Sequence, residues 1–338
     1  MKKITILLIL SVFIILIGFN VTACSRTPQS SAEAGAVSTG TVVAGTETSG
    51  AVTTDGAAAG GPDIAISARP SQPAVRAGLY ADDNPITSVP ANNLKAAFDY
   101  ANANPGPAEN PTKYILQIDQ DISSGVLFLG APPAADQPFA DLTIIGIGGE
   151  RTIQYNGPAI GSLFFIGDTI SGLRGRLTLG NNITLKGIQT GEEPLVNVIF
   201  GSLTMEAGSK ITGHKTSNIG GAVSVYNTFV MNGGEISGNE STYMHSAGAV
   251  FVSVAATQGN FTMNGGTITG NTGGFGSAVI VDGNEWEGAA VFTMNGGTIT
   301  GNTSLGEVSM PMDVWVRRGA SFTRTGGTIG ALEDHNNY

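Results

Sequence analysis

Short runs of alternating apolar and polar residues fill most of the chain, and Gly-Gly or Gly-Asn ends each run after three or four residues. This alternation predicts β-strands and excludes helical repeats. The elevenmer FTMNGGTITGN occurs at 261–271 and again, unchanged, at 292–302. Matching strand starts lie about thirty residues apart, which indicates stacked repeats. These starts are Ile115, Leu142, Leu177, Leu203, Phe229, Phe261, Phe292 and Phe322.

Each repeat is predicted to contain three short strands. In one repeat they are Phe261–Met263, Thr267–Thr269 and Ala278–Val281. Such a unit cannot close a core alone, but its neighbour can pair with all three strands at ~4.8 Å, in parallel and in register. The sequence therefore predicts an all-β fold, a parallel β-helix (solenoid). Right-handedness follows from the general rule for parallel crossovers.

A short helix is predicted to cap the N-terminal end of this solenoid. Asn92 or Asn93 can cap it, and Asn104-Pro105-Gly106 ends it. One apolar face falls at helical spacing: Leu94, Ala97, Phe98 and Ala101.

In-register stacking also predicts two amide ladders, because like residues then lie above one another. The first ladder is Asn232, Asn264 and Asn295. The second is Asn239, Asn271 and Asn302. In the last repeat Thr325 and Leu332 replace the two asparagines, as expected for a terminal turn.

Outward positions form further columns. The third strands place valines inward and leave Ser224, Phe251, Ile280 and Trp315 outward. An apolar column on an outer face has two interpretations: an insert such as Gly283–Ala290, with Trp286, folds over it, or it is a platform that binds sugar rings or a partner's apolar surface. A second outward column is Lys210, Glu235, Thr267 and Thr298. There Lys210 and Glu235 are expected to form an exposed ion pair.

Composition narrows the class of partner. The chain has 49 glycines, 12% charged residues and a formal net charge of −10. It has no basic cluster beyond Arg317-Arg318, so nucleic acid is not expected as a partner.

The N-terminus predicts export. Lys2 and Lys3 precede the apolar run Ile4–Phe19, which is too short to span a bilayer. Val21-Thr22-Ala23-Cys24 follows and resembles the lipobox of bacterial lipoproteins, which implies cleavage before Cys24 and acylation of this sole cysteine. The expected organisation is a signal peptide (1–23), a flexible Ala/Gly/Ser/Thr-rich tether (24–78) and the β-helix domain (79–338). Ser25 after the lipidated cysteine is compatible with an outer-membrane location in a cell with two membranes.

Over residues 92–332 the repeats resemble the pectate-lyase-like right-handed β-helix proteins, and more closely exported bacterial surface proteins with FTMNGGxIxGN-type repeats and GGAVxV-type strands. This resemblance implies the fold. It does not fix an activity, since the scaffold hosts lyases, hydrolases, adhesins and spacers.

No catalytic residues are predicted. The acids Asp282, Glu285 and Glu287 lie in one insert and are weak candidates for Ca²⁺; a solvated loop is the alternative. The three histidines lie in unrelated turns or in the tail, without the spacing of a metal site. No other cofactor is expected. The expected function is a lipid-anchored, non-enzymatic adhesin or carbohydrate-binding protein of the cell envelope, whose partner is a polysaccharide or a protein of a host or cell surface. The alternatives are a polysaccharide lyase or glycoside hydrolase, and a passive spacer.

Overall fold

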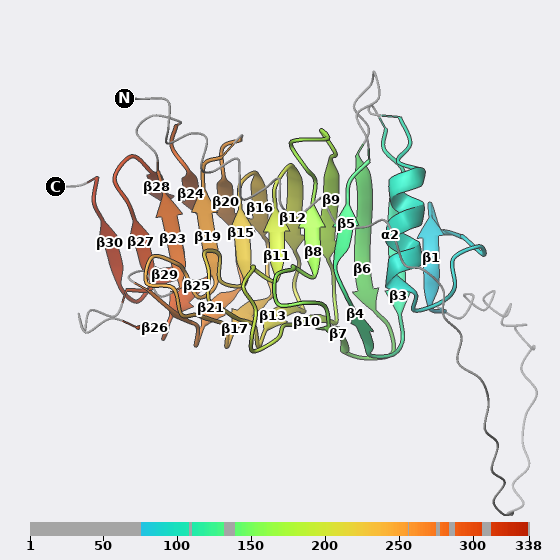
Figure 1. Cartoon of the computed structure of the whole chain (residues 1–338), viewed down its shortest axis with the longest axis horizontal. Coiled ribbons are helices and arrows are strands. Elements are labelled where there is room, and N and C mark those ends of the chain that lie inside the picture. Colours follow the sequence, from blue (N-terminus) through green and yellow to red (C-terminus); the bar gives the residue numbers. More distant parts are fainter. Residues whose placement is uncertain are drawn as a thin grey trace, which may run out of the picture. The chain divides into compact units, whose positions relative to one another are not determined.

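The protein is described by a computed structural model over residues 76–107, 110–131, 139–255, 257–274, 278–283, 288–305 and 312–336. These residues form a parallel β-solenoid of about seven turns with one short helix before it. Figure 1 shows the strands stacked side by side, from β1 near the helix to β30 at the far end. The predicted fold class is confirmed as a parallel β-solenoid.

Three long sheets run along the solenoid, and each turn adds one strand to each sheet. Sheet A holds β2 (Asn84–Pro85), β1 (Gly78–Ala81), β3 (Lys113–Ile118), β6 (Ala140–Gly146), β9 (Gly175–Leu179), β12 (Gly201–Met205), β16 (Thr228–Met231), β20 (Asn260–Met263), β24 (Val291–Met294) and β28 (Ser321–Arg324). Sheet B holds β4 (Ile122–Ser124), β7 (Arg151–Tyr155), β10 (Ile183–Lys186), β13 (Ser209–Thr212), β17 (Glu235–Ser237), β21 (Thr267–Thr269), β25 (Thr298–Thr300) and β29 (Thr328–Ile329). Sheet C holds β5 (Leu127–Leu129), β8 (Phe164–Ile166), β11 (Val196–Val198), β15 (Val223–Val225), β19 (Val250–Ser253), β23 (Val279–Asp282), β27 (Val314–Val316) and β30 (Leu332–Asp334).

A fourth, smaller sheet was not predicted. Sheet D consists of the two-residue strands β14 (Lys215–Thr216), β18 (Glu240–Ser241), β22 (Thr272–Gly273) and β26 (Thr303–Ser304). The sequence prediction of three strands per repeat is therefore incomplete. Two-residue strands are too short to show a period of two, so only the stacking of neighbouring turns reveals them.

The register follows the repeat. Phe261 pairs with Phe292, and the Thr and Met residues beside them pair likewise. Both phenyl rings are almost fully buried, with centroids 4.7 Å apart and planes within 6° of parallel. Identical residues thus occupy identical environments in successive turns, as the repeated elevenmer predicts.

The first turn differs from the prediction by one residue. Tyr114, not Ile115, pairs with Leu142, and Tyr114, Leu116 and Ile118 are the buried residues of β3. A shift of one residue moves every side chain to the opposite face. Neighbouring strand starts in the later turns could be aligned on shared motifs, but β3 has an apolar residue on both faces, so its sequence does not fix the phase.

The N-terminal end is closed by α2 (Leu94–Ala103) and by a hairpin of β1 and β2. The side chain of Asn93 caps α2 by accepting a hydrogen bond from the N–H of Ala96, at 2.9 Å. Phe98 of α2 stacks on Phe164 of the core with ring centroids 5.2 Å apart. The predicted helix and its apolar face are confirmed, and β1, which runs antiparallel to β3, is an addition to the prediction.

The C-terminal turn has charged residues at positions that are apolar and buried in earlier turns. Arg324 pairs with Met294 and Asp334 pairs with Val316, so each stands where earlier turns place a buried apolar residue. Charged residues at inward positions of a terminal strand discourage pairing with another sheet edge. The last turn thus ends the core without a helix among the residues described.

Candidate binding face

The outer face of sheet B carries two in-register rows of polar side chains, and we call this surface the binding face. Residues of these rows alternate with the inward-pointing residues of each strand, which are mainly isoleucine. The first row is Thr152, Thr184, Lys210, Glu235, Thr267, Thr298 and Thr328. The second row is Ser123, Gln154, Lys186, Thr212, Ser237, Thr269 and Thr300.

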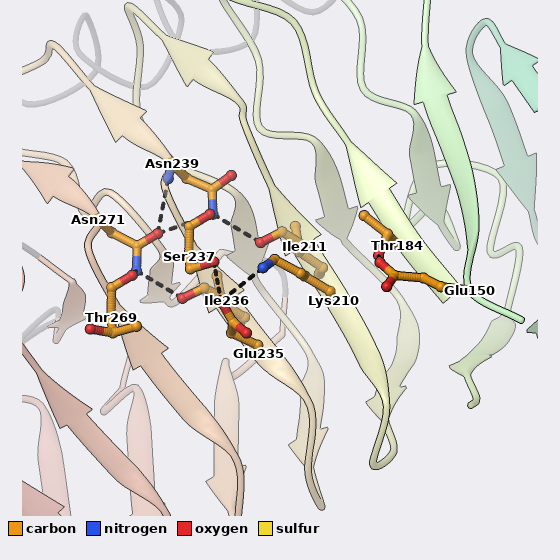
Figure 2. Close-up of polar contacts among 10 residues, drawn as sticks. All are labelled: Glu150, Thr184, Lys210, Ile211, Glu235, Ile236, Ser237, Asn239, Thr269 and Asn271. Carbon is orange, nitrogen blue, oxygen red and sulfur yellow. Dashed lines mark hydrogen bonds and ion pairs between the residues drawn. The ribbon is translucent and has the colours of Figure 1, made fainter. Parts of the chain in front are cut away.

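Contacts between neighbouring turns hold the centre of this face in place (Figure 2). The ammonium of Lys210 lies 3.0 Å from the carboxylate of Glu235, which confirms the predicted ion pair. The hydroxyl of Ser237 donates to the same carboxylate. Both contacts lower the pKa of Glu235, and the hydrogen bond from Ser237 is the largest single cause. In the turn before Lys210, the hydroxyl of Thr184 donates to the carboxylate of Glu150.

The face deepens at its N-terminal end into a polar trough of about 310 Å³. It is lined by Asp121, Ile122, Ser123, Thr152, Gln154 and Lys186. Asp121 is fixed by accepting from the N–H of Thr152 at 2.8 Å, and Gln154 donates to the carbonyl of Gly187 at 2.9 Å. Lys186 is exposed and forms no ion pair with any residue in the described ranges. The trough therefore presents an unpaired cation among hydroxyl, amide and carboxylate groups.

A second cavity of about 590 Å³ adjoins the trough, since Ile122 and Ser123 line both. Its other walls are the start of α2 and the turn between β4 and β5. The two hollows together extend the binding face toward the capped end of the solenoid.

The first asparagine ladder lies beside the binding face and is exposed. Asn264 donates to the side-chain oxygen of Asn232, and Asn295 donates to that of Asn264, both at 2.9 Å. Thr325 continues the ladder by donating to Asn295 at 2.9 Å. Glu206, which the sequence reading missed, accepts from Asn232 at 2.8 Å at the other end.

The second ladder is buried. Asn271 is 0% exposed and donates to Ile236 O, Thr269 O and the side chain of Asn302. Its own side-chain oxygen accepts from both nitrogen groups of Asn239. Asn239 and Asn271 thus satisfy backbone groups of their own turn and of the turn before, and Asn302 satisfies those of the turn before.

Two residues at the ends of this ladder were missed. The sequence predicts His214 in an unrelated turn, but its backbone N–H donates to the side-chain oxygen of Asn239 at 3.1 Å. Asp313 accepts from the N–H and the side chain of Asn302. Leu332, which the sequence aligned with Asn302, pairs instead with Val314. The spacing of His214 from Asn239 matches the repeat and could have revealed it, whereas Asp313 comes from an insert of irregular length.

The apolar column of sheet C has the predicted register but is covered. Phe251 pairs with Ile280, which pairs with Trp315. Phe251 is 3% and Ile280 0% exposed, and they cluster with Ala247 from the segment after β18. These two side chains therefore offer no open platform, and binding of a ligand to them would require the covering segment to move.

An arginine clamp lies at the end of that column. Arg317 stacks on Trp315, pairs with Asp282 at 2.9 Å and donates to the carbonyl of His245 at 3.1 Å. Asp282, a weak candidate for Ca²⁺, is thus engaged by a cation. Within the described ranges, no group of three or more His, Cys, Asp or Glu residues is arranged to hold a metal ion.

Several predicted residues lie outside the described residues: Cys24, Glu285, Trp286 and Glu287. The predicted signal peptide (1–23) and almost all of the predicted tether (24–78) lie outside them too. The only helix labelled among the described residues, α2, has 10 residues, and no described helix is long and apolar enough to span a bilayer.

Comparison of the chain with protein-family models, with curated proteins and with solved structures found no match.

Proposed function

We propose that this protein is a glycan-binding protein of the cell envelope and that the binding face is its ligand site. The observation that carries the proposal is the pair of in-register polar rows that end in a trough with an unpaired Lys186. Hydroxyl, amide and ionic groups at fixed spacing suit a ligand that presents hydroxyl groups along its length.

The shape of the face favours an extended chain over a compact molecule. Successive turns repeat at ~4.8 Å, so a polysaccharide lying along the solenoid would meet a new pair of polar side chains at every turn. Cross-turn contacts such as Lys210–Glu235 fix the side chains in advance, which lowers the entropy lost on binding.

The finer parts of the assignment belong to the same proposal. They are acylation at Cys24, anchoring in the outer membrane or at the cell surface, and kinship with pectate-lyase-like right-handed β-helix proteins. The lipobox-like segment and the FTMNGGxIxGN repeats support them. Cell fractionation tests the anchor. We expect Cys24→Ala to move the protein from the membrane fraction to the soluble fraction.

A glycan array probed with the purified full chain tests ligand binding. We expect retention of at least one class of polysaccharide without cleavage, and a loss of affinity of about tenfold or more in a Gln154→Ala, Lys186→Ala double variant, since charged hydrogen bonds are each worth ~1.5–3 kcal/mol. Arg318→Ala removes an exposed cation elsewhere and is the matched control.

Three outcomes would contradict this proposal. New reducing or unsaturated ends in the bound glycan would indicate a hydrolase or a lyase. Absence of retention would indicate a spacer. Equal affinity of the double variant and the native chain would place the glycan site elsewhere.

A further inference from the structure

Two arginines gather around two phenyl rings where sheets C and A meet. Arg174 directly precedes β9 and Arg176 lies within it, while Phe139 and Phe200 precede the neighbouring strands β6 and β12. The guanidinium carbon of Arg174 lies 5.6 Å from the centre of the Phe139 ring and 4.6 Å from that of Phe200. That of Arg176 lies 4.1 Å from the centre of the Phe139 ring. Three successive turns thus contribute to one cluster.

The backbone fixes this cluster. Arg174 and Ala131 exchange two backbone hydrogen bonds, of 3.0 and 3.1 Å, and the N–H of Phe200 donates to Ile166 O at 3.0 Å. Arg176 pairs in register with Asp141 of β6. The planes of the guanidinium groups are therefore held by aromatic faces and their main chains by neighbouring turns.

Among the described residues, no hydrogen-bond acceptor is found for the donors of these guanidinium groups. The Nε of Arg174 is buried and has no hydrogen-bond partner. Arg176 comes closest to the carboxyl of Asp141, at 3.9 Å, which is too long for a hydrogen bond. Neither guanidinium donates to another residue in the part of the chain that the structure describes. Stacking on phenyl rings engages only the flat faces of these groups and does not satisfy their N–H donors.

The charge around the cluster is positive although the chain is acidic. Burial raises the pKa of Asp141, against the opposing effects of Arg176 and Lys113. One carboxyl group with a raised pKa therefore faces the two cations Arg176 and Lys113, and Arg174 lies on the same phenyl ring as Arg176, in a chain of formal net charge −10. A buried, unsatisfied Arg donor in such surroundings favours an anionic partner.

We propose that Arg174 and Arg176 bind a tetrahedral oxyanion, a phosphate or sulfate group carried by a ligand. A carboxylate has two oxygens, which one guanidinium fork already satisfies. A phosphate or sulfate monoester offers three acceptor oxygens beside its ester link and can receive both forks. This site lies at the junction of sheets A and C, apart from the binding face on sheet B, and its existence does not depend on glycan binding.

Nitrogen-15 NMR of the full chain tests the site through the Nε–H resonances of the two arginines. Addition of inorganic phosphate or sulfate is expected to shift both resonances to saturation, and sodium acetate at equal ionic strength is not. Equal, non-saturating shifts with phosphate, acetate and chloride would overturn the proposal. This readout uses the native chain, so it does not depend on the folding of a variant.

A variant provides the second test. Arg176→Gln, whose parent side chain is 42% exposed, is expected to fold and to lower the affinity for phosphate about tenfold or more, the loss of one charged bidentate contact. Arg324→Gln, which removes an exposed arginine at the last turn, is the control with the same change of charge. Native affinity in Arg176→Gln would refute the assignment.

A third experiment identifies the kind of molecule that carries the oxyanion. A soluble polymer that carries sulfate monoesters and vesicles of phosphatidylcholine with phosphatidic acid are compared with vesicles of phosphatidylcholine alone. If the native chain binds the polymer and Arg176→Gln does not, the ligand is polymeric. The same result with the anionic vesicles indicates a lipid headgroup. Saturation by inorganic phosphate without binding to either carrier indicates a small free ester.

Discussion

At the scale of single residues, burial determines how much each asparagine of the two ladders contributes to the stability of the fold. Asn264 and Asn271 lie in the same repeat, and both bridge successive turns through side-chain amides. Asn264 is exposed, so water can replace its partners, whereas Asn271 is 0% exposed and satisfies buried backbone carbonyls. A hydrogen-bonding group buried without a partner costs about 1–3 kcal/mol.

Asn271→Ala is accordingly expected to destabilise the solenoid by about 2–4 kcal/mol, since it orphans several buried groups at once. The matched variant Asn264→Ala is expected to cost about 0.5–1 kcal/mol. Urea unfolding followed by circular dichroism measures both, and equal losses would show that the buried ladder has no special role.

His214 makes stability depend on pH. Burial lowers the pKa of its imidazole, although the hydrogen bond to Glu193 O opposes the shift. The unfolded chain therefore binds a proton at His214 at a higher pH than the folded chain does. This contribution to stability is complete above the unfolded pKa, about 6.5, and is lost as the pH falls below it.

His214→Gln is thus expected to flatten the loss of stability between pH 7 and pH 5. Melting temperatures of the variant and of the native chain across this range provide the measurement. An unchanged slope in His214→Gln would mean that another group causes the dependence.

At the scale of elements, stacking of identical residues stabilises the solenoid. Phe229, Phe261 and Phe292 form a continuous stack with centroid separations of 4.8 and 4.7 Å. Phe322 continues it at 5.1 Å, but its ring is tilted by 30° and only partly buried. The central strands of sheet A therefore bury more aromatic surface than the terminal strand does.

Phe261→Ala is expected to cost about 3–5 kcal/mol, the usual loss for a fully buried phenyl group. Phe322→Ala is expected to cost less than half of that because its ring already meets solvent. Chemical denaturation of both variants tests this gradient along the sheet, which a uniform cost would contradict.

At the scale of the whole molecule, one turn is the unit of the fold. Asn260 pairs with Val291 and Phe261 pairs with Phe292, so residues 261–291 make up one complete period. Each turn contacts mainly its neighbours, which makes stability roughly a sum over turns and their interfaces. Removal of a whole period keeps all inward residues inward, but removal of one residue fewer shifts the following strand by one position.

Deletion of residues 261–291 is therefore expected to give a folded solenoid that is one turn, ~4.8 Å, shorter. Deletion of residues 261–290 is expected to lose cooperative unfolding, because the next strand of sheet A then starts one residue out of phase. Circular dichroism and urea titration distinguish the two products, and equal stability would show that register is weakly specified.

The sequence by itself determined the architecture, because parallel in-register stacking acts between residues one period apart. This rule makes the Phe stack, the valine columns of sheet C, both asparagine ladders and the Lys210–Glu235 pair readable from spacing. The sequence also restricted the cap of α2 to Asn92 or Asn93, because capping is a local interaction, and the structure selects Asn93.

Only the tertiary structure decided the contacts that cross between turns and loops of unequal length. These include the phase of β3, the short strands of sheet D, the cover over Phe251 and Ile280, and the role of Asp313. The stacking of Arg174 between Phe139 and Phe200 belongs to the same group. Their partners are set by how a loop folds back on the solenoid, and a periodic pattern carries no information about that path.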